Sequence, residues 1–116
     1  MTTAADGAEA PASRPGPSRP VVCLDLDGVV WRGDEPVPGS AGAVRDLRAA
    51  GLVVGFMSNN SSMPVADVVA KLARCGVDAG PEHVLTSALA AADLLADGLA
   101  AGSRVLVCAG PGVVES

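Results

Sequence analysis

The chain has 116 residues, enough for one small domain. Hydrophobic residues make up 49% of it but aromatic residues only 2%, so its core has to be built from Val, Leu and Ala. The formal net charge of −5 argues against a nucleic-acid surface, which needs clustered Lys and Arg. We find neither an apolar run long enough for a membrane span nor a secretory leader, so we expect a cytoplasmic protein.

The N-terminal segment and the cysteines fit that expectation. Residues 1–19 are punctuated by Pro and Gly without hydrophobic periodicity, which predicts a disordered tail. The three cysteines, Cys23, Cys75 and Cys108, form an odd set without metal-like spacing. We expect buried, reduced thiols.

The most informative stretch follows the tail. Residues 21–26 are apolar apart from Asp25, which predicts a strand buried on both faces, as in the centre of a parallel sheet. Asp25 and Asp27 lie where this strand leaves the core, and strand alternation puts their carboxylates on the same side. Two like charges so close together favour a bound cation, so the pair predicts a Mg²⁺ site. Gly28 then allows a close backbone approach.

The next elements predict a parallel βαβ unit. Residues 29–39 mix apolar and turn residues as a small hairpin does, and we expect Trp31 to anchor it, the alternative being that it packs over a ligand. Residues 40–50 have helical periodicity, and residues 52–57 form a second apolar strand. Two strands joined by one helix are expected to pair in parallel.

A second polar cluster, residues 58–62, follows that strand. Ligands of open α/β sheets bind outside the carboxyl ends of the strands, so Ser58, Asn59 and Asn60 should share an edge with the Asp pair. Hydroxyl, amide and backbone N–H groups in such a loop can donate to phosphate oxygens. The alternative is an ordinary turn that caps the next helix.

The remaining elements follow the same alternation. We expect an amphipathic helix over residues 64–75, a short strand over 84–86, a helix over 87–99 and a strand over 104–108. The helix that follows residue 86 should turn its apolar side chains inward: Leu89, Ala92, Leu95 and Leu99.

These residues carry a resemblance to a known family. The run from Asp25 to Trp31, together with Gly33 and Gly39, resembles the first motif of the haloacid dehalogenase superfamily, and the residues 57–62 resemble its second. The combination is most similar to subfamily IIA, the NagD-like, nitrophenylphosphatase and phosphoglycolate phosphatase branch. The resemblance implies a Rossmann-like α/β core of parallel strands and flanking helices over residues 20–109, with residues 110–116 as the start of a cap domain or a truncated end.

The resemblance also implies a mechanism for phosphate monoester hydrolysis. Asp25 would be the nucleophile that becomes an aspartyl-phosphate, and Asp27 the general acid and base. Mg²⁺ would be held by the Asp25 carboxylate and the Asp27 backbone carbonyl. Ser58 would bind the phosphoryl group of a small phosphorylated metabolite, with Asn59 and Asn60 in support and backbone amides around Gly28 completing the cradle.

The sequence departs from the family pattern in one respect. Family members have a later lysine and later acidic residues, whereas Lys71 is the only lysine of this chain, and we expect it to face solvent. The chain therefore resembles an incomplete phosphatase core of low activity. The alternative is a non-catalytic module that binds Mg²⁺ or phosphate, and a metal-dependent glycosyltransferase, which can also use an Asp-x-Asp pair, is a more distant one.

Overall fold

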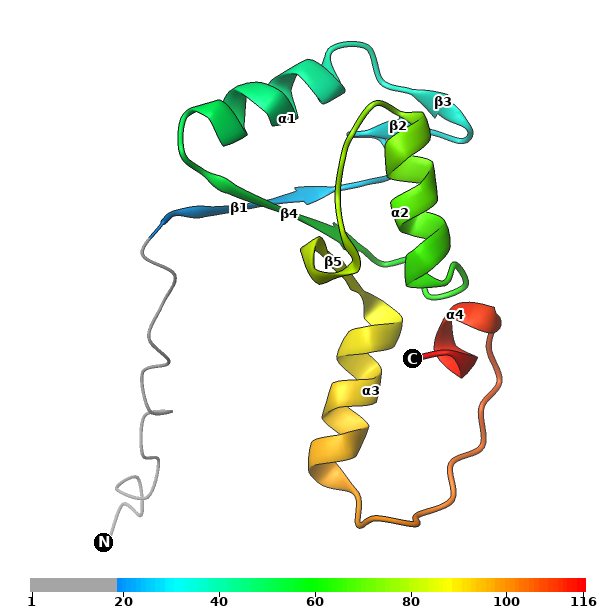
Figure 1. The fold of residues 1–116 in the computed structure, drawn as a ribbon. Coiled ribbons are helices and arrows are strands. Elements are labelled where there is room, and N and C mark those ends of the chain that lie inside the picture. The colour runs from blue at the N-terminus through cyan, green and yellow to red at the C-terminus, as the bar shows by residue number, and fades with distance from the viewer. Residues whose placement is uncertain (1–18) are drawn as a thin grey trace, which may run out of the picture.

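The computed structural model describes residues 19–116, and Figure 1 shows their arrangement. The expected disordered tail, residues 1–19, lies outside the described residues except for Arg19. The Arg19 Nε donates to the Gly51 carbonyl oxygen at 3.0 Å. This bond joins the start of the described chain to the turn before the second strand of the sheet.

A parallel sheet forms the centre of the fold. Its strands are β1 (Val21–Asp25), β4 (Val53–Ser58) and β5 (Val84–Thr86), in the order β1-β4-β5. Both pairings are parallel, with Asp25 opposite Met57. The α/β class, the parallel βαβ unit and the shared edge for the two polar clusters are therefore confirmed.

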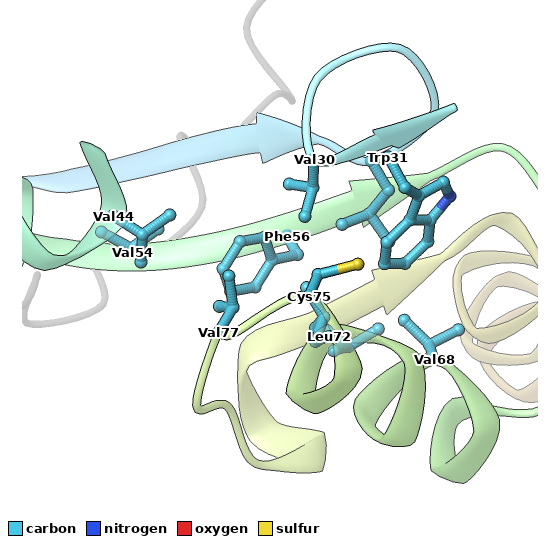
Figure 2. Packing of buried hydrophobic residues seen from close by; sticks show 11 residues of the cluster. Val30, Trp31, Val44, Val54, Phe56, Val68, Leu72, Cys75 and Val77 are labelled. Atoms are coloured by element: carbon cyan, nitrogen blue, oxygen red, sulfur yellow. The ribbon is translucent and has the colours of Figure 1, made fainter. Parts of the chain in front are cut away.

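Two helices pack on the same face of this sheet. They are α1 (Ser40–Ala49) and α2 (Val65–Arg74), close to the expected bounds. Figure 2 shows their side chains gathered around Phe56 of β4 in one cluster. The core is lined mainly by aliphatic side chains, as the composition predicted: Leu26, Val30, Val44, Val54, Val68, Leu72, Val77 and Val84.

The opposite face of the sheet is open. Side chains that alternate with the core residues are largely exposed, among them Val21, Met57 and Leu85. The prediction of a first strand buried on both faces is therefore wrong, and β1 is also an edge strand of the described sheet rather than a central one. The physical reason is that α1 and α2 cover one side only.

A small hairpin joins β1 to α1, as expected. Its strands are β2 (Trp31–Arg32) and β3 (Glu35–Pro36), and they pair in antiparallel register. Trp31 is only 3% exposed, so the expectation that it anchors the hairpin is confirmed. Gly39, at φ +86°, supplies the left-handed residue from which α1 starts.

The C-terminal part departs most from expectation. Helix α3 (Ser87–Gly98) forms as predicted, and the Thr86 Oγ1 caps it by accepting from Leu89 N at 3.2 Å. Its outer turns extend beyond the sheet, as Figure 1 shows, so Leu95 and Leu99 are exposed and the prediction that they face inward is wrong.

The strand expected over residues 104–108 is absent from the described chain. This segment runs as an extended connection away from the sheet, and Leu106 is 89% exposed. An apolar run forms a strand only where another strand offers its backbone hydrogen bonds, and here none lies beside it. A short helix, α4 (Pro111–Val114), follows and donates Gly112 N–H to the Ser62 carbonyl oxygen at 3.0 Å.

The cysteine prediction is half right. All three cysteines are free, but only Cys75 is buried, whereas Cys23 lies on the open face of the sheet and Cys108 in the exposed connection. Among the helices of residues 19–116, none has the length and apolar character needed to cross a bilayer.

Candidate active site

Asp25 is the last residue of β1 and lies on the open face of the sheet. Its side chain is exposed, and its Oδ1 accepts a hydrogen bond from the Leu26 backbone N at 2.9 Å. This bond orients the carboxylate from the main chain without covering it. The carboxylate remains accessible to a ligand at the carboxyl end of the sheet.

Asp27 lies in the tight loop that follows. Its Oδ1 accepts from the indole Nε1 of Trp31 at 2.9 Å. Gly28, at φ +84°, closes the loop, and its N–H donates to the Trp31 carbonyl oxygen at 2.7 Å. The Gly28 amide, which the resemblance assigns to the phosphate cradle, is thus engaged within the loop.

The loop after β4 is ordered by its own polar groups. The Ser58 Oγ accepts from Asn60 N at 3.1 Å, and the Asn60 Oδ1 accepts from Ser62 N at 2.9 Å. The Asn59 carbonyl oxygen accepts from the Ser87 Oγ at 3.1 Å. The alternative that this cluster caps the next helix is not supported, because the N-cap of α2 is Pro64, without a side-chain bond.

Two hollows meet at Ser58. The larger is an open cleft of about 570 Å³ lined by Asp25, Ser58 and Asn59, with apolar side chains of the open sheet face. The smaller, of about 30 Å³, is lined by Asp27, Ser58 and Asn60. The two carboxylates line different hollows. The prediction that they point to the same side is therefore wrong, because β1 ends at Asp25 and strand alternation does not continue to Asp27.

The sequence did not predict that Lys71 lies beside the candidate site. The prediction that it faces solvent is wrong: its side chain is 11% exposed, and it lines the smaller hollow. Its helical position suggested a solvated charge, but the hairpin folds over that side of α2 and supplies Trp31 and a backbone carbonyl as partners. The only available signal was that its apolar neighbours Val68 and Leu72 lie on the same stripe.

The donor set can accommodate Mg²⁺. Among the described residues there is no group of three or more His, Cys, Asp or Glu side chains that could hold a metal ion. Mg²⁺ is, however, commonly bound by one or two carboxylates together with waters and substrate phosphates. The accessible Asp25 carboxylate at the rim of an open cleft fits that mode of binding.

The fold and the site define a class of protein. Parallel strands that end in carboxylates and in a hydroxyl and amide loop, all at one edge, are typical of α/β proteins that bind ligands at the carboxyl ends of their strands. The family model of haloacid dehalogenase-like hydrolases matches residues 22–116, and the chain belongs to this family.

Individual relatives agree with that assignment. The chain is 42% identical over 84 residues to D-glycerol 3-phosphate phosphatase of Mycobacterium tuberculosis, which covers 72% of this chain and 23% of that protein. The crystal structure of the glycerol phosphate phosphatase from that organism, in complex with magnesium, superposes with a TM-score of 0.73 at 36% identity, covering 82% of this chain and 28% of that one.

A third relative identifies the branch. NagD from E. coli K-12 superposes with a TM-score of 0.71 at 29% identity, covering 84% of this chain and 38% of that one. The predicted membership in subfamily IIA is confirmed. The chain spans about a quarter of the length of the curated mycobacterial relative.

Proposed function

We propose that this chain carries the nucleophile and the acid/base of a Mg²⁺-dependent phosphatase that acts on a small phosphate monoester. The observation that carries the proposal is the single edge where Asp25, Asp27 and Ser58 surround two adjoining hollows. The names of the mycobacterial relatives support phosphate esters as the substrate class.

The first step would transfer the phosphoryl group to the protein. An Asp25 oxygen attacks phosphorus while the bond from phosphorus to the ester oxygen breaks, which gives an aspartyl-phosphate. The leaving alkoxide takes a proton from Asp27. The Ser58 hydroxyl and the side-chain amides of Asn59 and Asn60 would hold the phosphoryl oxygens as negative charge develops there.

The second step would return the protein to its starting state. Asp27 accepts a proton from water, the water oxygen attacks phosphorus, and the bond to Asp25 breaks to release inorganic phosphate. The Asp25 carboxylate and the Asp27 carbonyl would hold Mg²⁺, which supplies positive charge that lets an anionic nucleophile approach an anionic ester. Turnover by the 116-residue chain is expected to be slow, because it lacks the later lysine of the family pattern and its only lysine is Lys71.

The leaving group offers a sharp test of these two roles. With p-nitrophenyl phosphate the leaving phenolate is a weak base and needs little help from an acid, so Asp27→Asn should still complete the first step but stall at the second. We expect a burst of at most about one nitrophenolate per protein, followed by a steady rate about 10²–10⁴-fold below that of the unchanged chain. Asp25→Asn should abolish both phases.

An alkyl ester provides the matched control. Glycerol 3-phosphate has a strongly basic leaving group, so Asp27→Asn should show no burst with it. Equal nitrophenolate release by the unchanged chain and Asp25→Asn would contradict the proposal. If instead Mg²⁺ and inorganic phosphate raise the melting temperature without any turnover or burst, the chain is the non-catalytic binding module of the alternative.

A further inference from the structure

Lys71 has no place in the proposed mechanism, yet it is the only charged residue that is buried in the described part of the fold. It lies in the last turn of α2, and its side chain is 11% exposed. An ammonium group that leaves water needs compensating contacts, because burial of an unpaired charge is costly. The identity of those contacts indicates what Lys71 does.

All three contacts of the ammonium group lie on the β2–β3 hairpin. The Lys71 Nζ donates to the Gly33 carbonyl oxygen at 2.6 Å and lies 4.6 Å from the centroid of the Trp31 ring. The latter distance is within the range of a cation–π interaction, for which Trp is the best partner. The third contact, 3.7 Å from the Asp34 Oδ1, adds little, because the Asp34 carboxylate is fully exposed.

The same indole ring reaches the loop of the proposed acid/base. Trp31 Nε1 donates to the Asp27 Oδ1 at 2.9 Å, and the backbone of Trp31 bonds to Gly28 in the same loop. Figure 2 shows the indole at the end of the apolar cluster, with its nitrogen directed away from Leu72 and Val68. One face of the ring therefore meets the cation and its N–H edge meets the carboxylate.

We propose that Lys71 is a positioning residue that acts through Trp31 on Asp27. The ammonium group fixes the plane of the indole and the turn at Gly33, and the indole N–H then fixes the Asp27 Oδ1. This leaves the Oδ2 as the oxygen that exchanges a proton with the ester or with water. The catalytic consequence rests on the proposed function, whereas the coupling from Lys71 to Asp27 is a property of the fold and can be measured without turnover.

The single Trp of the chain makes the coupling measurable. In a ¹⁵N-labelled sample, the indole Nε1–H gives one side-chain signal whose hydrogen exchange reports opening of the bond to Asp27. Lys71→Met keeps much of the apolar stem but removes the charge. We expect indole exchange about tenfold faster than in the unchanged chain, relative to the backbone amides of β4.

Three variants control for the cation and for general destabilisation. Lys71→Arg keeps a cation over the ring and should restore slow exchange to within about twofold. Arg74→Met removes an exposed cation from the same helix and should change nothing. If Lys71→Met does not fold, Lys71→Gln removes the charge while leaving a donor for Gly33.

The route through Asp27 is tested by a double variant. Asp27→Ala alone should speed indole exchange, and the further effect of Lys71→Met in that background should be well below tenfold, because both changes release the same ring. The proposal is overturned if Lys71→Met accelerates indole and β4 amide exchange equally, if it leaves indole exchange within about twofold of the unchanged chain, or if its effect is undiminished in Asp27→Ala. None of these results depends on phosphatase activity, so they are separate from a failure of the proposed function.

Discussion

Adjacent residues of β4 should respond very differently to truncation, because only one face of the sheet is covered. Phe56 is 1% exposed in the core, whereas Met57, the next residue, is 45% exposed on the open face. Phe56→Ala leaves a cavity and should lower the free energy of unfolding by about 3–5 kcal/mol. Met57→Ala loses about half of a buried methionine's transfer free energy and leaves no cavity, so about 1 kcal/mol is expected.

Urea unfolding followed by far-ultraviolet circular dichroism measures both losses. Because small domains have only about 5–15 kcal/mol of stability, Phe56→Ala should shift the transition strongly or unfold the chain. Met57→Ala should shift it slightly with an unchanged slope. Similar losses for the two variants would refute a one-sided core and would mean that the open face is covered in solution.

Two other predictions concern local structure and use the same unfolding assay. Thr86→Val keeps the shape of a buried side chain but removes the hydroxyl that caps α3, so it should lower the free energy of unfolding by about 1 kcal/mol. Ser103→Ala removes a hydroxyl at an exposed turn and should cost much less. Equal effects of the two variants would show that the cap contributes nothing. Gly39→Ala places a Cβ in open space but at φ +86°, so backbone strain alone should lower the free energy of unfolding by about 1–2 kcal/mol. Gly98→Ala at the end of α3 is the control and should raise the free energy of unfolding by about 0.4–1 kcal/mol. A neutral Gly39→Ala would contradict the strain argument.

The sequence was sufficient to predict the elements that depend on local patterns. Both α1 and α2 have clear apolar stripes and end near glycines, and the strand containing Phe56 is a continuous apolar run. The parallel pairing followed from one helix between two strands. The position of Ser58 next to Asp25 then followed from a general property of parallel sheets, so the candidate site could be located before the structure was known.

The features that sequence patterns could not give depend on contacts between distant segments. Leu106 lies in an apolar run typical of a strand, but no neighbouring strand is present in the described chain to pair with it. Lys71 looked like a solvated helix charge because its burial depends on the hairpin folding across α2. The different orientations of Asp25 and Asp27 depend on where β1 stops, and the ends of elements are the least reliable feature to predict from sequence patterns.

The central claim is that Asp25 is the phosphorylated residue, and trapping the covalent intermediate tests it most directly. Asp27→Asn is incubated with p-nitrophenyl phosphate and Mg²⁺, reduced with borohydride, which converts an acyl phosphate to an alcohol, and mapped by peptide mass spectrometry. We predict reduction at position 25 alone, dependent on both the ester and Mg²⁺. Reduction at another residue, or release of nitrophenolate without any modification at position 25, would contradict the account.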